Sequence, residues 1–152
     1  MKRLWLVIWL LVLLAGCAAD DAPLPPWYPA VNADGDPVFA VFESRIPCEN
    51  CEKIKFALAL YTDPAGGAPT TYQMARVFVG RGNDRIINEG NWSITRGTSL
   101  DPQAVVYRLD SGAPEEFQAF WAIGEDILFI LDQDMQPRVG DAGYSYALNR
   151  QP

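Results

Sequence analysis

Residues 56–61 read Phe56-Ala57-Leu58-Ala59-Leu60-Tyr61, and their alternation decides the fold class. Phe56, Leu58 and Leu60 occupy every second position, so in an extended chain they share one face. A helix would instead repeat its apolar side chains every three to four residues. The stretch therefore predicts a β-strand, and the same period recurs along the chain.

Seven further segments alternate in this way or form a short continuous apolar run. With 56–61, the expected strands are residues 38–42, 72–78, 92–94, 105–109, 117–123, 127–131 and 144–148. Clusters of Gly, Pro, Asp and Asn separate many of them, at 63–67, 82–84, 110–112, 124–126 and 132–134. Such short connections are typical of antiparallel neighbours in sequence order. No segment of the mature chain predicts a long helix.

About eight antiparallel strands in sequence order leave two open edges unless the sheet closes on itself. Eight is also the strand number at which a barrel interior is filled by side chains or holds one small ligand. We therefore expect an all-β fold, a small up-and-down barrel over residues 38–152. A two-sheet sandwich is the alternative.

The N-terminus has the pattern of an export signal. Lys2 and Arg3 precede an apolar run at 4–14, which is too short to span a bilayer, and the run ends in Leu14-Ala15-Gly16-Cys17. This ending resembles the lipobox of bacterial lipoproteins. The resemblance implies a signal peptide at 1–16, cleavage before Cys17, and a membrane anchor through lipid on Cys17. An ordinary signal peptide with an incidental cysteine is the alternative.

Lipoproteins of this kind stay in the inner membrane when Asp follows the lipidated cysteine, but Ala18 follows it here. The resemblance thus implies the outer membrane, on its periplasmic face. Residues 17–37 are rich in Pro and Asp and predict an extended tether, with Trp27 and Tyr28 expected to pack onto the domain.

Charge and composition exclude several function classes. Loss of residues 1–16 takes Lys+Arg from 12 to 10 against 19 Asp+Glu, leaving a charge of −9, so no basic patch for nucleic acid is expected. The chain has no histidine, which excludes Ser–His–Asp and Cys–His catalysis and imidazole-bound zinc or haem. No nucleophile–base pair can be named, and we expect no enzyme.

The candidate site is Ile46-Pro47-Cys48-Glu49-Asn50-Cys51-Glu52, a turn between two expected strands. Cys48 and Cys51 could form a local disulfide, which the oxidising periplasm favours, or bind Cu(I) as two thiolates. Met74 or Met135 could add a thioether ligand. A redox-active pair is a third reading, but the basic residues nearby are offset by acids and no helix N-terminus lowers the thiol pKa. Two thiols without histidine exclude a tetrahedral zinc site.

The segment Pro47-Cys48-Glu49-Asn50-Cys51-Glu52-Lys53-Ile54 resembles the N-terminal domain of the NlpE family, bacterial lipoproteins often labelled copper resistance proteins. The resemblance continues through Tyr72, Val79-Gly80, Gly90-Asn91-Trp92, the run 128–137 and the closing stretch 144–148. It implies a lipocalin-like barrel. Lys53 departs from the glycine usual in the family, and the second domain of longer members does not follow.

The resemblance also implies a non-enzymatic role in envelope-stress sensing or copper tolerance, with an envelope-stress signalling protein as partner and Cu(I) as a ligand of Cys48 and Cys51. The alternative is a lipocalin-like carrier of a small apolar ligand. Bulky inward side chains would argue against a carrier, whereas a lined void would favour it.

Three remaining motifs have simpler readings. Asp132 and Asp134 predict a turn, because the glycine and distal glutamate of a calcium loop are absent. Gly80-Arg81-Gly82 follows a strand but opens no helix, which argues against nucleotide binding. Trp92 and Trp121 are expected in the core.

Overall fold

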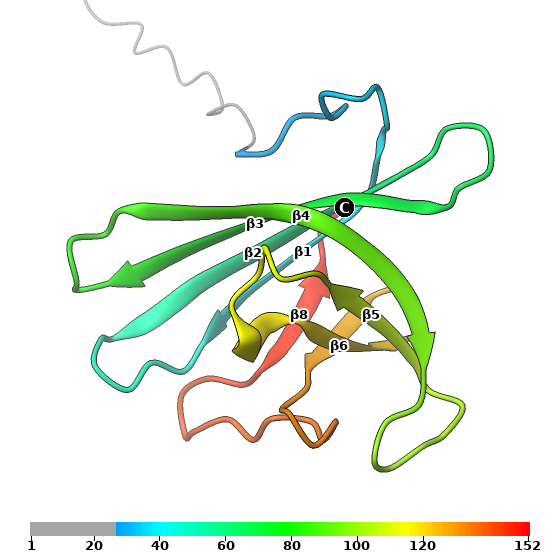
Figure 1. Ribbon diagram of the computed structural model, residues 1–152. Helices are drawn as coiled ribbons and strands as arrows, with labels where there is room; N and C mark the ends of the chain where they lie inside the picture. Colours follow the sequence, from blue (N-terminus) through cyan, green and yellow to red (C-terminus); the bar gives the residue numbers. More distant parts are fainter. Residues whose placement is uncertain (1–26) are drawn as a thin grey trace, which may run out of the picture.

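Strands are the main regular structure of the described chain, as the alternating sequence predicts. The computed structural model describes residues 27–152, and its eight antiparallel strands close into one barrel in the order β1 to β8 (Figure 1). The strands are β1 (Val38–Ile46), β2 (Lys53–Thr62), β3 (Pro69–Val79), β4 (Arg85–Arg96), β5 (Val105–Leu109), β6 (Ala119–Ile123), β7 (Ile127–Ile130) and β8 (Ala147–Arg150). The up-and-down barrel is confirmed, and the two-sheet alternative is wrong.

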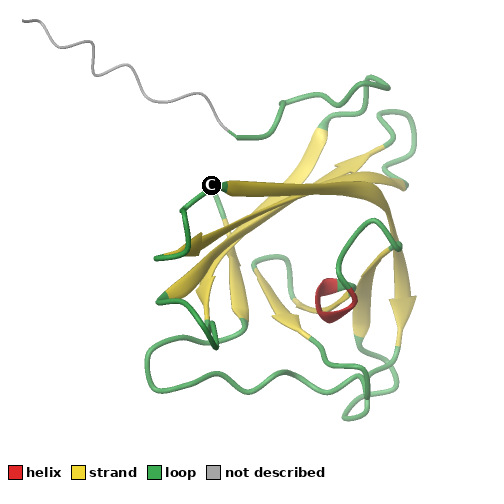
Figure 2. Ribbon diagram, turned by 60° about the vertical axis from the view of Figure 1, so that its left-hand side comes forward, coloured by secondary structure: helices red, strands yellow, loops and turns green. Residues whose placement is uncertain are grey.

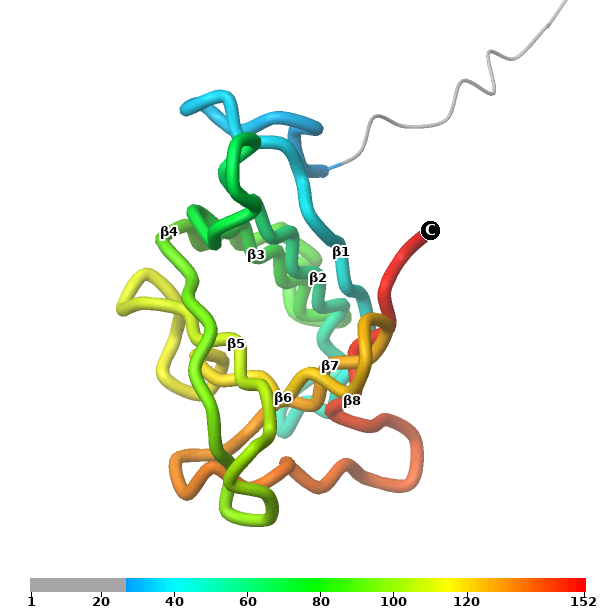
Figure 3. Tube along the Cα trace, turned by 90° about the vertical axis from the view of Figure 1, so that its right-hand side faces the viewer, coloured from blue at the N-terminus to red at the C-terminus, as the bar shows by residue number. Residues whose placement is uncertain are grey.

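The barrel closes because β8 returns to β1, with Phe42 opposite Arg150 and Glu43 opposite Asn149. Viewed from the side in Figure 3, the strands follow one another around a ring. Each strand from β2 to β7 pairs with its two neighbours in sequence. The first and last strands, β1 and β8, each pair with their one sequence neighbour and with each other. This arrangement leaves no strand at the edge of an open sheet.

Every second side chain points into the barrel and fills it. Phe42 on β1 faces Leu58 on β2, and Leu58 faces Met74 on β3; all three are at most 1% exposed. The same cluster contains residues from every other strand, namely Trp92, Leu109, Phe120, Leu128, Ile130 and Leu148. Bulky aromatic and aliphatic side chains thus occupy the centre.

The strand β4 is longer than the sequence suggests. It begins at Arg85 rather than near Trp92, pairs with β3 over 85–91, and then bends to pair with β5 over 92–96 (Figure 1). Gly90 lies inside the strand. A Cβ there would sit 2.1 Å from Asp110 Oδ1, so this glycine permits a close approach and does not end the strand.

Two predicted strand ends are wrong. Phe117 belongs to the short 3-10 helix η2 (Glu115–Phe117), the small red turn of Figure 2, and β6 begins only at Ala119. Tyr144 lies before β8, which runs from Ala147 to Arg150. In both places an aromatic side chain packs from a loop, and its apolar character imitates the alternation of a strand.

The start of the described chain packs on the outside of the barrel. Trp27 and Tyr28 lie against Val41, Ala59 and Tyr61, which confirms the expected packing of these two rings. The predicted signal peptide, the lipidation site Cys17 and residues 17–26 of the tether lie outside the described residues. Within residues 27–152, no helix is long and apolar enough to cross a membrane.

Candidate functional site

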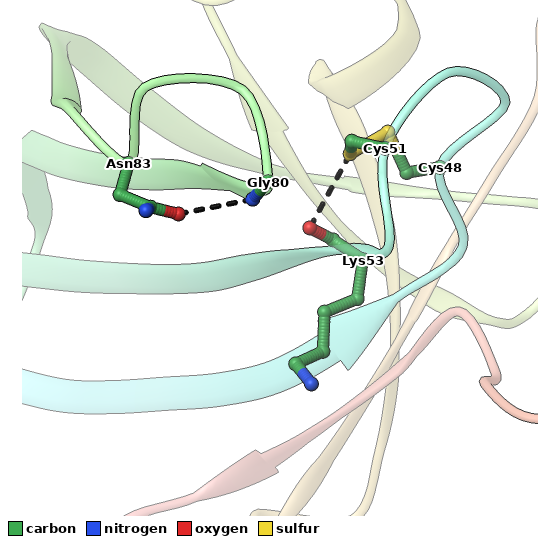
Figure 4. Close-up of a disulfide and its surroundings, with 5 residues drawn as sticks. All are labelled: Cys48, Cys51, Lys53, Gly80 and Asn83. Carbon is green, nitrogen blue, oxygen red and sulfur yellow. Dashed lines mark hydrogen bonds between the residues drawn. A yellow bond between two sulfur atoms is a disulfide. The ribbon is translucent and has the colours of Figure 1, made fainter.

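The Cys turn, residues 47–52, joins β1 to β2 and carries a disulfide between Cys48 and Cys51 (Figure 4). The two Cα atoms are 5.3 Å apart, within the usual range for a disulfide. Both cysteines are half-buried and pack against the core cluster, whereas Glu49 and Asn50 between them are exposed. The bond therefore lies at the end of the barrel, beneath an exposed bend.

The strand pairs on either side hold the turn. Ile46 pairs with Ile54 just before and after it, and Glu52 N donates to Val79 O at 3.0 Å. The adjoining turn, residues 80–84, is fixed by Asn83, whose side-chain oxygen accepts from Gly80 N at 3.0 Å (Figure 4). Gly80-Arg81-Gly82 is thus part of a β-hairpin turn, in agreement with the reading that excludes nucleotide binding.

One ion pair lies directly after the disulfide. Glu52 and Lys53 form an ion pair, and the hydrogen bond from Lys53 lowers the pKa of the Glu52 carboxyl while raising that of the Lys53 ammonium. Cys51 Sγ lies 3.4 Å from Lys53 O (Figure 4). A disulfide sulfur carries no proton, but a reduced Cys51 thiol would be placed to donate there. Both elements that flank the Cys turn are strands, so no helix N-terminus lies beside the pair to lower a thiol pKa.

A soft metal at this end would depend on Cys48 and Cys51 alone. Met74 is buried on β3 opposite Leu58, five residues from Val79 and therefore about 16 Å along the strand from the Cys turn. Met135 packs on the outer face of the barrel against Val106 and Trp121. In the part of the chain that the structure describes, no three acidic or cysteine ligands gather around a common point.

An open pocket of about 390 Å³ borders the Cys turn. Cys48, Ile54, Phe78 and Phe117 form part of its wall, and Arg138 lies against it. The Arg138 guanidinium stacks on Tyr146, 4.1 Å from the ring centre, and donates to Tyr146 Oη at 3.1 Å. No local pattern in the sequence indicates this pocket, because its residues come from four separate loops and strand ends.

One further residue beside the pocket was missed. Arg76 is 8% exposed and occupies an inward position of β3, between Met74 and Phe78 in the alternation. Its place on the apolar face of an expected strand was a signal that the sequence did contain. A charged side chain in such a position is unusual unless it is paired.

The remaining sequence motifs are structural. Asp132 Oδ1 accepts from Asp134 N at 2.9 Å and from Gln136 N at 2.9 Å, so this carboxylate closes a turn as predicted. Trp92 is 4% exposed and donates to Tyr61 O at 2.7 Å, as expected of a core residue. Trp121 is half-buried and packs, like Met135, against a second hydrophobic core cluster of Val106, Ala119 and Leu131.

The Cys turn and residues 29–37 lie at opposite ends of the barrel, whereas Trp27 lies beside the middle of β1 and donates to Glu43 Oε1 at 3.2 Å. Tyr61 Oη donates to Pro29 O at 2.9 Å at the C-terminal end of β2, and the Cys turn precedes its first residue, Lys53. A ten-residue strand spans roughly 30 Å, so about that distance separates the two ends. In Figure 1 the described start of the chain lies at the top and the β1–β2 connection at the lower left.

A closed eight-stranded barrel with a C-x-x-C disulfide turn at one end defines a class of small all-β barrel domains. The family model described as the NlpE N-terminal domain matches residues 42–141, which include most of the barrel and the whole Cys turn. This chain belongs to the NlpE family.

Two solved structures resemble the chain at low identity. One is a protein of Shewanella oneidensis assigned as a lipoprotein, with 19% identity and a TM-score of 0.46, covering 73% of this chain and 86% of that one. The other is the Cpx pathway activator NlpE of Escherichia coli, with 20% identity and a TM-score of 0.44, covering 70% of this chain and 48% of that one. This chain therefore matches about half the length of the Escherichia coli protein. No curated protein matches the sequence.

Proposed function

We propose that this protein is a lipid-anchored outer-membrane lipoprotein of the NlpE type that senses envelope stress, including copper, at its Cys turn. The observation that carries the proposal is the placement of the disulfide at the end of the barrel opposite residues 29–37, the described part of the tether that leads into β1. With lipid on Cys17, this placement would direct the Cys turn away from the membrane and toward the periplasm. Family membership supports the lipoprotein and stress-related parts.

Copper would bind the reduced form. A dithiol reductant would deliver two electrons and two protons to the Cys48–Cys51 bond and itself become a disulfide. Cu(I) would then replace the thiol protons and bind the two sulfurs. Their place in a four-residue span at the end of a hairpin lets both reach one ion without disturbing the strands.

The sensing role requires a partner, and the exposed bend at Glu49 and Asn50 is the surface that changes most directly when the disulfide opens. We propose an envelope-stress signalling protein as that partner. We propose a non-enzymatic role, which membership of the NlpE family supports. The filled interior argues against the alternative of a lipocalin-like carrier.

The test is a Cu(I) titration of the full chain, reduced and purified in a non-ionic detergent, with a competing chelator. About one Cu(I) per barrel is expected, and the Cys48→Ser variant should lose it. Met135→Leu is the matched control, since its sulfur lies on the outer face and should not contribute. Unchanged binding in Cys48→Ser would exclude the Cys turn as the copper site.

A thiol count on protein trapped in intact cells tests the sensing step. The disulfide should predominate in unstressed cells, and free or metal-bound thiols should increase under copper stress. If the disulfide persists under all conditions and the double serine variant has an unchanged stress response, the bond has only a structural role.

A further inference from the structure

Arg76 is the only charged side chain buried to nine-tenths or more within residues 27–152. Its Nη2 donates to Asn88 Oδ1 at 3.0 Å, whereas its buried Nε has no partner. Burial lowers the pKa of this guanidinium, but an arginine stays protonated in proteins. A full positive charge therefore lies beneath the end of the barrel without a carboxylate in contact, although buried charges are normally paired.

Arg138 is a second guanidinium without a carboxylate in contact. It donates to Glu116 O at 3.4 Å and to Tyr146 Oη at 3.1 Å, which uses two of its five N–H donors. Over residues 27–152 the one ion pair is that of Glu52 with Lys53, so neither Arg76 nor Arg138 is neutralised by contact. Such an arrangement is unexpected in a chain of net charge −7.

Both arginines lie against the same ring. The Arg76 guanidinium is 5.4 Å and that of Arg138 5.9 Å from the centre of the Phe117 ring. Phe117 and Phe78, which also contacts Arg76 at 5.7 Å, form the apolar wall of the 390 Å³ pocket beside the Cys turn. The pocket thus combines an aromatic wall, two cations on its surface, Arg138 and the exposed Arg81, and a third cation behind the wall.

The charges at the rim restrict which anion fits. Glu49, Glu116 and Asp141 also line the pocket, and their side chains are exposed to solvent. Solvent and salt weaken their repulsion of a single negative charge, but a multiply charged anion would experience it several times over. The acidic residues at the rim and the apolar wall of Phe78 and Phe117 together favour a ligand with a single negative charge attached to an apolar group.

We infer that this pocket binds a small organic monocarboxylate. The carboxylate accepts from the free donors of Arg138, the charge of Arg76 supports it from behind Phe117, and the apolar body lies on Phe78 and Ile54. The site goes beyond the proposed function, because it requires neither reduced cysteines nor copper. A negative result for copper binding at the Cys turn would therefore not exclude carboxylate binding in the pocket, and the reverse also holds.

Calorimetric titration of the full chain, oxidised and in non-ionic detergent, tests the inference. Benzoate and hexanoate present one carboxylate on an aromatic and an aliphatic body, benzyl alcohol is the neutral analogue, and inorganic phosphate carries charge without a body. Either monocarboxylate should bind at least about tenfold more tightly than benzyl alcohol and phosphate, as expected when a charge-assisted bond is lost. Amide shifts in NMR spectra should gather at 47–50, 78–81 and 138–141.

Arg138→Gln should weaken carboxylate binding about tenfold or more. Arg150→Gln is the matched control, because Arg150 also lies over a ring, 5.5 Å from the centre of Phe39, and donates to main-chain oxygens at the other end of the barrel. The affinity of Arg150→Gln for benzoate or hexanoate should remain that of the wild type. Arg76→Met should weaken binding as well; if that variant does not fold, Arg138→Gln decides alone.

Three results would overturn the inference. Equal affinity for benzoate and benzyl alcohol would show an apolar pocket without a role for the arginines. Equal affinity for phosphate would show a general anion site. Absence of binding, or amide shifts confined to another surface, would exclude the pocket altogether.

Discussion

The first four strands and the last four build the same barrel in different ways. The strands β1 to β4 have 9 to 12 residues and pair in long registers, whereas β5 to β8 have only 4 or 5. In the second half, side chains that bind main-chain groups fix the connections, as Asp110 does for Asn91 and Asp141 for Gly143. Side chains also fix turns in the first half, as Asn83 does, but long registers hold its strands as well, whereas the short strands of the second half depend more on individual side chains.

The largest expected effect tests the rigidity of the first half. Leu58→Ala should reduce the free energy of unfolding by about 4 kcal/mol, since the long strands around it cannot close the cavity. Leu128→Ala, on the four-residue β7, should cost only about 2–3 kcal/mol, because shorter strands relax more easily. Urea unfolding followed by circular dichroism measures both. Equal losses would show that the halves are equally rigid.

The next effect concerns the Cys turn. Replacing both cysteines by serine should destabilise the protein by about 2 kcal/mol, the loop entropy of so short a disulfide. The barrel should stay folded, because β1 and β2 pair along their whole length without the bond. Chemical reduction of the wild type should give the same loss. Collapse of the β-sheet signal in either sample would mean that the bond, and not the register, holds this hairpin.

A smaller effect tests the second half. Asp110→Ala should cost about 1–2 kcal/mol, because its carboxylate accepts from Asn91 N at 2.8 Å, Asn91 Nδ2 at 3.2 Å and Gly112 N at 3.0 Å. Asp63→Ala is the control in the first half, where the carboxylate accepts only from the exposed Ala65 N, and it should cost under about 0.5 kcal/mol. Thermal unfolding compares the two, and a larger loss in Asp63→Ala would reverse the distinction between the halves.

The smallest effect is the pH dependence of the same contact. The hydrogen bond from Asn91 N, followed by that from Gly112 N, lowers the pKa of the Asp110 carboxyl. The stabilisation is therefore present above about pH 4, the ordinary value of an aspartate, and disappears as the pH falls through the lower folded value. The difference in unfolding midpoint between wild type and Asp110→Ala should shrink below about pH 4. A constant difference down to pH 2 or so would assign the effect to packing instead.

The two halves also differ in how well the sequence predicts them. In the first half a period of two identifies the strands, because long alternating runs face a packed interior on one side. Gly90 misled the prediction of β4, since a glycine required by the approach of Asp110 resembles one that ends a strand. In the second half Phe117 and Tyr144 imitate strand residues although they pack from loops. Contacts between loops far apart in sequence determine these positions, and local periodicity does not record them.

The candidate site also has one part that the sequence predicts and one part that it does not. The C-x-x-C spacing pointed directly to Cys48 and Cys51, because two cysteines in a turn have few uses. The pocket beside them depends on how η2 and the segment 131–146 fold back to the end of the barrel, and the sequence gives no distance between them. Arg76 was detectable as a charge on an inward face, but its shared contact with Phe117 was not.

The join between β1 and β8 has a mechanical consequence. Only Phe42 and Glu43 of β1 face residues of β8, whereas β1 pairs with β2 along its whole length. Tension applied at the N-terminal end of the domain reaches β1 first. We expect the pairing between β1 and β8 to break first, while the β1–β2 hairpin stays intact. Pulling would therefore open the closed barrel into a sheet before any other strand pairing is lost.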